Sequence, residues 1–411
     1  MSFRLYDPER DKNAVHRIWQ EVGWIEKDKT EIMDLFITKA ATAMVAEVNN
    51  EAECLVLRTP GSIRYLDQDL PFAGVTGVTT SRVARKQKLA SRLTARVIAD
   101  GVAEGASVFG LGMFEQGFYN QLGFGTGSYD HWLGFDPARL RVQVRARIPR
   151  RITVDDWAKV HAARLARKRG HGSCNLTPPE LTQAEIKWAD KGFGLGYIDE
   201  QGNITHHLWG HCDDIDHGPY HINWMSYQNY DQFLELMALI KNLGDQVRLF
   251  EMQEPVGIQL QDLIAQPFKQ RQISAKSRFA TKSRADAYWQ ARICDLAACL
   301  EKTRLPGADG VLRFNLRLTD PIEQFLDEDA PWRGIGGEYV VALGPSSSAK
   351  RGVDASLLTL TASVNAFTRL WLGVCPATGL AVTDDLTAPP VLLAQLDRRL
   401  LLPKPSFEWD F

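Results

Sequence analysis

Residues 1–135 alternate between short apolar runs of strand length and stretches in which apolar residues recur every three or four positions. This pattern predicts a mixed α/β unit, in which strands form a sheet and amphipathic helices cover it. Asp7-Pro8 is typical of a helix cap followed by the first helical position, and Asn49-Asn50-Glu51 is typical of a hairpin turn. The expected strands are Phe3–Tyr6, Ala43–Val48, Cys54–Leu57, Phe72–Thr80 and Val108–Met113, and the expected helices include Val15–Val22, Leu89–Val102 and Glu115–Leu122.

A second unit begins near Arg145 and repeats the strand–helix–strand order of the first. The repetition indicates an internal duplication of architecture. Where the first unit passes from strand to helix through a basic segment, the second has Gln228-Asn229-Tyr230-Asp231, which offers no cation to a phosphate. The second copy is therefore expected to be degenerate. Its expected elements are strands at Gly196–Asp199, Ile204–Trp209, Ile222–Tyr227 and Val247–Met252 and a helix at Tyr230–Leu243.

A Lys/Arg/Ser-rich run from Lys269 to Arg284 separates the second unit from a third. Such a run is typical of a linker or an exposed face, and a functional basic patch is the alternative. In the third unit the pattern predicts a helix over Tyr288–Leu300. The strands expected after it are Val311–Leu318, Tyr339–Leu343 and Ser356–Thr361. We therefore expect three domains, at residues 1–145, 146–285 and 286–411.

Composition and charge narrow the class of protein. The 411 residues are 45% hydrophobic and 24% charged, and the net charge of −2 provides no basic field for nucleic acid. The start is charged within four residues and no apolar run is long enough to cross a bilayer, so we expect no signal peptide and no membrane partner. The six cysteines form no CxxC pair, which is typical of reduced thiols, and we expect a cytoplasmic protein.

The segment VTGVTTSRVARKQKLAS at residues 75–91 joins a predicted strand to a predicted helix and places Arg85, Lys86 and Lys88 in the turn. The first turn of a helix has unpaired N–H groups of positive sign, which suit a pyrophosphate. The three cations strengthen that preference. An ordinary basic turn between strand and helix is the alternative, and the segment alone does not decide between the two.

A second motif, GFYNQLGF at residues 117–124, follows the next predicted strand. Tyr119 lies on a short helix that ends at Gly123-Phe124, where its hydroxyl could donate a proton near the strand ends. A packed aromatic residue with a solvated hydroxyl is the alternative for Tyr119 considered alone.

Together the two motifs resemble those of the GNAT superfamily of N-acetyltransferases, whose pyrophosphate turn is Arg/Gln-x-x-Gly-x-Gly/Ala and whose acid motif is Tyr-x-x-x-Gly-Phe. The turn is Arg85–Ala90 here, and the acid motif is Tyr119–Phe124. The length and the three-part plan further resemble the Eis-like (enhanced intracellular survival) branch. The resemblance covers the whole chain, with specific motifs only in the first domain. It implies an α/β (α+β) fold with tandem GNAT folds, the second degenerate, followed by a sterol-carrier-protein-like domain.

The resemblance also implies roles for individual residues, with acetyl-CoA as co-substrate and no metal. Tyr119 would protonate the departing thiolate, and the α-carboxylate of Phe411 would be the base, reaching back into the first domain. The coenzyme would contact a strand edge, the basic turn and the neighbouring strand. The residues implied are Val78, Thr79, Thr80, Arg85, Lys86, Gln87, Lys88, Leu89, Ala90, Ser91, Phe114 and Glu115.

Two features bear on how this site would work. Lys88 occupies the glycine position of the pyrophosphate motif, where glycine usually allows a positive φ or a close approach to the ligand.

The tail Phe407-Glu408-Trp409-Asp410-Phe411 alternates aromatic residues with acids, which favours an extended segment with the aromatics on one side. A tail that merely closes the third domain is the alternative. If the tail reaches the site, Asp410 would attract a cationic amine, and Trp24, Glu26 and Asp28 could line the same pocket.

Two further patterns are given less weight. The run from His206-His207 to His217 contains many metal-ligand types, but its spacing fits no familiar zinc pattern, and adjacent histidines on a strand point to opposite faces. We expect a polar strand end and loop there. Gly110-x-Gly112 is too short for a dinucleotide fingerprint and lies inside a predicted strand.

The expected function is acetyl-CoA-dependent transfer of an acetyl group to an amine, by direct attack in a ternary complex. In the Eis-like branch the acceptors are aminoglycosides, other polyamines and sometimes protein lysines, and the assembly is a homohexamer. The resemblance therefore implies an amine-bearing small molecule as acceptor and a homo-oligomer. The alternatives are transfer of a larger acyl group and a pseudoenzyme that keeps the fold as a ligand-binding or scaffold protein.

Overall fold

The computed structural model describes residues 2–26, 29–267, 276–305 and 310–410. Three sheets and their covering helices make up a mixed α/β fold, which confirms the predicted class. Contacts divide the chain into two compact units. Unit 1 comprises residues 1–128, 170–178 and 287–411, and unit 2 comprises residues 129–169 and 179–286. Because two domains can pack into one unit, the predicted domain boundaries at 145 and 285 stay a prediction.

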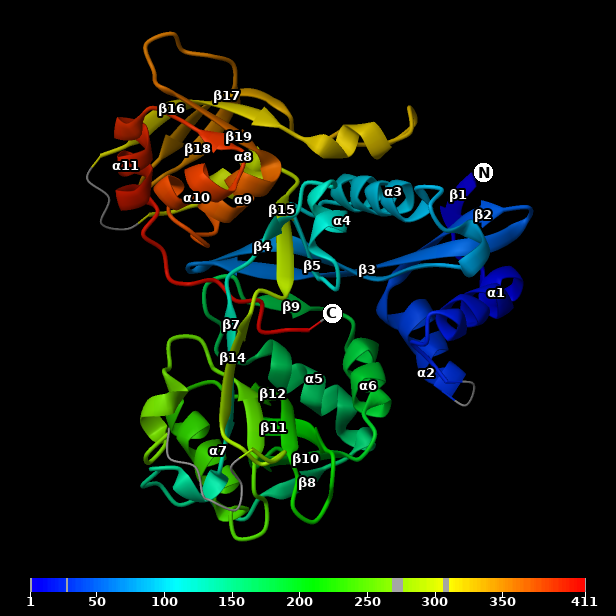
Figure 1. Ribbon diagram of the computed structural model, residues 1–411, viewed down its shortest axis with the longest axis vertical. Helices are drawn as coiled ribbons and strands as arrows, with labels where there is room; N and C mark the ends of the chain where they lie inside the picture. The colour runs from blue at the N-terminus through cyan, green and yellow to red at the C-terminus, as the bar shows by residue number, and fades with distance from the viewer. Residues whose placement is uncertain (1, 27–28, 268–275, 306–309, 411) are drawn as a thin grey trace. The chain divides into compact units, whose positions relative to one another are not determined.

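The larger sheet of unit 1 is built mainly from the first part of the chain (Figure 1). Its strand order is β1-β2-β3-β4-β5-β15-β6, and β9 pairs with β3. Asn49 and Asn50 both have positive φ in the turn between β2 and β3, as a tight hairpin requires. The strands are β1 (Ser2–Leu5), β2 (Thr42–Val48), β3 (Glu51–Tyr65), β4 (Gln68–Thr80), β5 (Val108–Gly112), β6 (Gly125–Thr126), β9 (Cys174–Leu176) and β15 (Trp289–Ile293).

Helices cover both faces of this sheet (Figure 1). Alternation along β3 explains the arrangement, because Leu55 and Leu57 pack with α1 while Cys54 and Val56 pack with α3. Asp7 caps α1 by accepting a hydrogen bond from the Glu9 N–H, as predicted. The helices are α1 (Pro8–Glu21), α2 (Thr30–Leu35), α3 (Leu89–Ala103) and α4 (Gln116–Asn120).

The third part of the chain begins with a strand where the sequence pattern predicted a helix. Trp289–Ile293 forms β15, which pairs with β5, and only α8 (Leu296–Glu301) is helical. The prediction over Tyr288–Leu300 is therefore wrong in its first half, because every residue of β15 is buried and no alternation marks it. A second sheet follows, in the order β18-β17-β16-β19-β20. Its elements are β16 (Leu312–Thr319), β17 (Gly337–Leu343), β18 (Ser348–Arg351), β19 (Thr359–Ser363), β20 (Leu386–Thr387), α9 (Val364–Trp371), α10 (Ala377–Thr383) and α11 (Pro390–Arg399).

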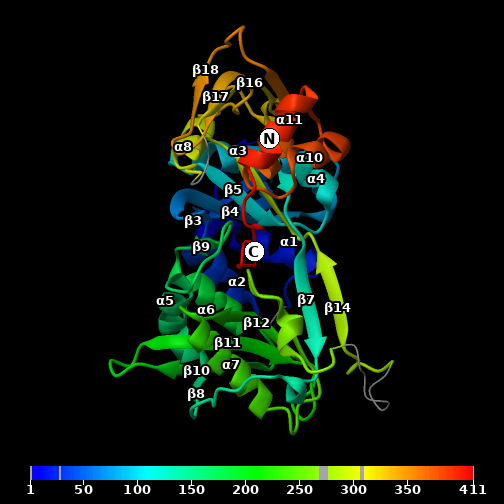
Figure 2. The same cartoon turned by 90° about the vertical axis from the view of Figure 1, so that its left-hand side faces the viewer.

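Unit 2 contains one sheet in the order β14-β7-β13-β12-β11-β10-β8, in which β7 and β14 run side by side (Figure 2). Its parallel pair β12–β13 is connected through α7, just as the pair β4–β5 of unit 1 is connected through α3. This shared order bears out the predicted duplication of architecture. The elements are β7 (Asp130–Phe135), β8 (Arg150–Ile152), β10 (Gly192–Ile198), β11 (Ile204–Cys212), β12 (Tyr220–Ser226), β13 (Phe250–Gln253), β14 (Lys282–Asp286), α5 (Trp157–Leu165), α6 (Pro179–Trp188) and α7 (Tyr230–Asn242).

Among the described residues, no helix has both the length and the apolar character that crossing a bilayer requires.

Candidate active site

The strands β4 and β5 separate at their carboxyl ends. They pair only through Phe72–Gly74 and Val108–Gly110, and β4 then continues to Thr80 paired with β3 but not with β5. A bulge bends β4 where it leaves β5, since Thr76 and Thr79 oppose Leu57 and Leu55 with Gly77 at φ 62° between them. The backbone of β4 beyond Gly74 therefore lines an opening between two parallel strands.

The turn from β4 to α3 contains the predicted pyrophosphate residues. Lys88 caps α3 with φ 60° and ψ 18°, the left-handed conformation that glycine adopts most readily, and Lys86 also has a positive φ. The lysine at the motif's glycine position thus keeps a glycine-like backbone, and no side chain caps the helix. The predicted coenzyme-binding residues differ in their exposure to solvent. The four polar residues of the turn are exposed: Arg85, Lys86, Gln87 and Lys88. Thr80 and Ala90 are half-buried, and the buried residues are Val78, Thr79, Leu89 and Ser91.

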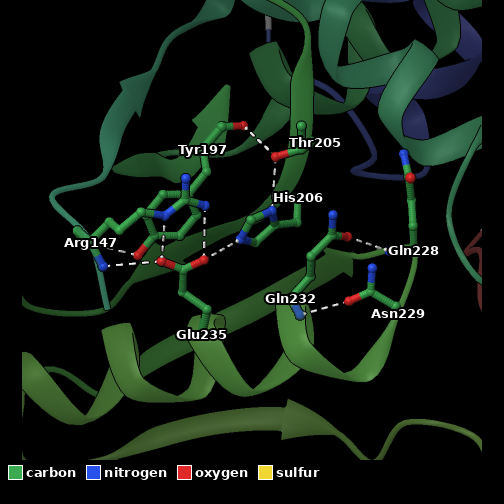
Figure 3. A network of polar contacts seen from close by, with 8 residues as sticks. All are labelled: Arg147, Tyr197, Thr205, His206, Gln228, Asn229, Gln232 and Glu235. Carbon is green, nitrogen blue, oxygen red and sulfur yellow. Dashed lines mark hydrogen bonds and ion pairs between the residues drawn. The ribbon is translucent and has the colours of Figure 1, made fainter. Parts of the chain in front are cut away.

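The corresponding turn in unit 2 is closed by its own side chains. The Asn229 side chain accepts a hydrogen bond from the Gln232 N–H, and the Gln232 side chain accepts one from the Gln228 N–H (Figure 3). The first turn of α7 is thus capped, whereas that of α3 is not. The second copy therefore lacks both the cations and the unpaired N–H group that would favour a pyrophosphate at this turn.

The histidines at 206 and 207 point to opposite faces of β11, as predicted. His206 contacts Glu235 of α7 at 3.1 Å, and Arg147 binds the same carboxylate (Figure 3). His207 accepts a hydrogen bond from Trp224 Nε1 at 3.1 Å. Arg147 and His206 hold the pKa of Glu235 at about 2, with the Arg147 hydrogen bond as the largest cause. In the described part of the chain, no group of three or more His, Cys, Asp or Glu side chains could hold a metal ion.

Tyr119 lies on α4, which directly follows the end of β5. Its side chain is 3% exposed and packs edge-on against Phe118, with ring centroids 4.9 Å apart, and against Phe114 and Phe124 at 6.2 Å. Burial, assisted by the nearby hydroxyl of Tyr288 and the Glu115 carboxylate, raises the pKa of Tyr119 well above its usual value. Its hydroxyl therefore keeps its proton throughout the neutral range, as a general acid must.

The third part of the chain supplies the residues that hold the Tyr119 turn. Asn365 on α9 donates to the Asn120 and Phe124 carbonyl oxygens at 2.7 and 2.8 Å. The buried Gln290 side chain on β15 donates to Asn120 Oδ1 at 2.6 Å, and Arg292 donates to the Leu122 carbonyl oxygen. Sequence reasoning missed these three residues. They are more than 160 positions from the turn, and no local pattern connects them to it.

Phe114 and Glu115, the predicted coenzyme contacts next to Tyr119, have different structural roles. Glu115 caps α4, and its carboxylate accepts hydrogen bonds from the Gly117 and Phe118 N–H groups. Phe114 is 73% exposed beside Tyr119, so it offers an apolar surface to a ligand. Glu115 thus shapes the acid helix, which the sequence did not predict.

The predicted acceptor residues lie after α1, on the face of the sheet opposite α3. Trp24 packs edge-on against the buried Trp19 at 5.6 Å and remains 39% exposed, and Glu26 is exposed. A side chain on Gly77 would contact Leu57 and Trp19, so Trp19 lies next to the bulge in β4. Asp28 lies outside the described residues.

The tail does not form the expected extended strand, although two of its aromatic residues are buried. Phe407 is 2% exposed and stacks on Trp289 at 4.3 Å, and Trp409 is 5% exposed. Glu408 has φ 52°, which breaks the extended conformation between the two rings. Asp410 is exposed, and Phe411 lies outside the described residues.

We predict that Lys88→Gly is more stable than Lys88→Ala by about 1 kcal/mol, because alanine retains the strain of a left-handed residue and glycine does not. Both variants remove the same charge, so each controls for the other. Urea unfolding midpoints provide the measurement. An alanine variant as stable as the glycine variant would show that position 88 has no need of the left-handed backbone.

Comparison with known proteins agrees with this geometry. Residues 8–127 match the family model of the acetyltransferase (GNAT) domain, and no curated protein matches the chain in sequence. Three solved structures resemble the present chain over 100% of its length. The first is a conserved protein of unknown function from Enterococcus faecalis V583, with 18% identity, a TM-score of 0.79 and 99% of that chain covered. The others are a GCN5-related N-acetyltransferase from Anabaena variabilis ATCC 29413, with 14% identity and a TM-score of 0.79, and Eis1 from Mycobacterium abscessus, with 15% identity and a TM-score of 0.75, each covered over 100% of its length. Residues 8–127 thus carry a GNAT domain, and the fold of the whole chain is that of these structures.

Proposed function

We propose that the protein is an N-acetyltransferase that moves the acetyl group of acetyl-CoA to an amine of a polyamine or aminoglycoside-like acceptor. The observation that carries the proposal is a juxtaposition within unit 1. The gap between β4 and β5, the uncapped start of α3 and the buried hydroxyl-bearing Tyr119 all lie where the two strands end. Along one acetyl-CoA molecule the helix start suits the pyrophosphate, the strand opening suits the pantetheine arm, and the Tyr119 hydroxyl suits the thiolate that leaves the thioester.

In the proposed mechanism the coenzyme binds along the strand opening. The N–H groups at the start of α3 bind the pyrophosphate, assisted by the charges of Lys86 and Lys88. The free edge of β4 at Val78–Thr80 pairs with the pantetheine amides. The neutral amine of the acceptor attacks the thioester carbonyl carbon, the C–S bond breaks, and the sulfur takes the proton from the Tyr119 hydroxyl. The nitrogen loses a proton as the amide forms, and a proton from solvent restores the Tyr119 hydroxyl.

The acceptor amine must lose its proton before it can attack. On the family resemblance we assign this step to the α-carboxylate of Phe411. Phe407 packs against Phe72 and Trp289 of unit 1, and this supports the assignment because it fixes the tail a few residues before its end. Glu26 and Glu115 are the side-chain alternatives, and the capping role of Glu115 makes it the weaker of the two.

The proposal predicts acetyl-CoA-dependent release of free thiol in the presence of amines. The assay compares acetyl-CoA with propionyl-CoA, and tests aminoglycosides, polyamines and a lysine-containing peptide as acceptors. Calorimetry should show acetyl-CoA binding, and bound coenzyme should raise the melting temperature. Faster turnover with propionyl-CoA would indicate a transferase of larger acyl groups. No binding of acetyl-CoA at millimolar concentration would overturn the proposal in favour of a pseudoenzyme.

A further inference from the structure

Residues 170–178 belong to unit 1, although the chain on both sides of them belongs to unit 2. Within this segment β9 pairs with β3, beyond the point where the pairing of β2 with β3 ends. The Gly172 N–H donates to the Arg64 carbonyl oxygen at 2.7 Å, and the Arg64 N–H donates to the Ser173 carbonyl oxygen at 2.9 Å. The segment therefore adds a short strand to the larger sheet of unit 1.

The tail lies beside this added strand and is joined to it by hydrogen bonds (Figure 1). Three bonds connect residues 170–174 with the tail: from the Ser406 N–H to the His171 carbonyl oxygen at 3.2 Å, from the Cys174 N–H to the Phe407 carbonyl oxygen at 2.9 Å, and from the Gly170 N–H to the Glu408 carboxylate at 3.3 Å. In addition, the buried Ser128 hydroxyl donates to the Pro405 carbonyl oxygen. Four successive tail residues are thus bound by groups of unit 1.

Gly172 allows the tail to approach this segment. Its φ is 83°, a value that residues with a side chain rarely adopt. A Cβ atom at this position would lie 2.7 Å from the Pro405 side chain and 2.9 Å from the Ser406 backbone nitrogen. Any side chain at position 172 must therefore displace the tail or the segment that binds it.

His171 fixes the carbonyl group to which Ser406 donates. The His171 Nδ1 accepts a hydrogen bond from the Leu66 N–H at 3.1 Å, and its Nε2 donates to the Leu372 carbonyl oxygen at 3.0 Å. The ring also packs edge-on against Tyr65, with centroids 4.9 Å apart. This pair of hydrogen bonds requires the neutral ring, and burial lowers the pKa of His171 to about 4. The anchor therefore persists throughout the neutral range.

We propose that residues 170–174 and Ser128 form a clamp that positions the end of the chain, with His171 and Gly172 as positioning residues that act through the tail. Residues 401–410 form no helix or strand, so the backbone of the tail depends on such contacts for its position. A base must lie within hydrogen-bond reach of its proton, and a displacement of about 1 Å can lower a rate on the order of a hundredfold. The catalytic consequence rests on the proposed function, whereas the clamp itself does not.

Gly172→Ala tests the clamp in the full-length protein. The methyl group should displace the tail and lower the turnover number by roughly tenfold to a hundredfold, with no change in the KM for acetyl-CoA. The loss should ease at high pH, where the acceptor amine is neutral without a base. Gly257→Ala is the matched control, because Gly257 has φ 76°, belongs to unit 2 and has no atom of the described residues within 4 Å of a Cβ. It introduces a similar backbone strain and should leave turnover unchanged.

Digestion by a carboxypeptidase measures the clamp without any acetyl transfer. Cleavage past Phe407 requires the tail to leave the clamp. It should therefore be roughly twofold to tenfold faster in Ser128→Ala, the factor for one hydrogen bond, and faster still in Gly172→Ala. Ser226→Ala is the matched control, because the buried Ser226 hydroxyl also donates to a backbone carbonyl oxygen, that of Ala163 at 2.8 Å, but in unit 2. This variant should be digested at the wild-type rate.

The two measurements separate this inference from the proposed function. Faster digestion of Gly172→Ala and Ser128→Ala would support the clamp even in a protein that transfers no acetyl group. Equal digestion rates in Gly172→Ala and Gly257→Ala would overturn the clamp. Faster digestion of Gly172→Ala with a wild-type turnover number at neutral pH would overturn the positioning role of His171 and Gly172.

Discussion

Replacing Tyr119 with phenylalanine is expected to lower the turnover number for acetyl transfer by roughly a hundredfold or more, the usual contribution of one acid–base group. The substitution keeps the ring that packs against Phe118 and Phe124 and deletes only the proton donor. Coenzyme affinity should barely change, because the pyrophosphate turn is formed by other residues. The loss should persist across neutral pH, since burial keeps the wild-type hydroxyl protonated there.

Tyr65→Phe is a matched control for this prediction. Tyr65 is a second buried tyrosine of unit 1, and its hydroxyl donates to the Trp371 carbonyl oxygen at 3.0 Å. Its loss should lower stability by about 1 kcal/mol, typical of one hydrogen bond, and leave turnover intact. Steady-state kinetics with saturating acetyl-CoA, and urea unfolding of both variants, provide the measurements. If Tyr119→Phe keeps the wild-type turnover number, Tyr119 is a packing residue.

Residues 1–135 were predicted well from the sequence because the signals in this part of the chain are local. Asp7-Pro8 begins a helix, two asparagines form a hairpin turn, and the alternation along β3 divides two cores, and each of these patterns is only a few residues long. The basic turn and the Tyr119 motif are equally short. The pattern failed at Trp289–Ile293, where a strand that is buried on both faces shows no period.

Two properties of the candidate site depend on tertiary structure and left no trace in the pattern. The left-handed backbone of Lys88 is not a preference of lysine, so nothing in the residue type predicts that conformation. The Tyr119 turn is held by side chains from β15 and α9, which reach it only after the third part of the chain has joined the sheet. This dependence indicates that the acid turn should weaken when those long-range contacts are removed.

Arg292→Met should reveal that dependence most strongly. The Arg292 side chain is fully buried and pairs at 2.8 Å with Asp320, which is 2% exposed, while also donating to the Leu122 carbonyl oxygen three residues after Tyr119. Methionine would leave a buried carboxylate without its counter-charge and a buried carbonyl without its donor. Removing one partner of such a pair typically lowers the free energy of unfolding by about 3–5 kcal/mol.

The control is Arg317→Met in the same unit, because Arg317 pairs with Glu338 at 3.0 Å on an exposed face of the second sheet. Exposed pairs contribute about 0–1 kcal/mol, so this variant should unfold close to the wild type. Arg292→Lys should lie between the two, since a lysine keeps the charge beside Asp320 but lacks the fork that also reaches Leu122. Urea midpoints order the three variants, and the turnover number should fall in Arg292→Lys with little change in the KM for acetyl-CoA. Equal midpoints for Arg292→Met and Arg317→Met would show that the buried pair does not hold the acid turn.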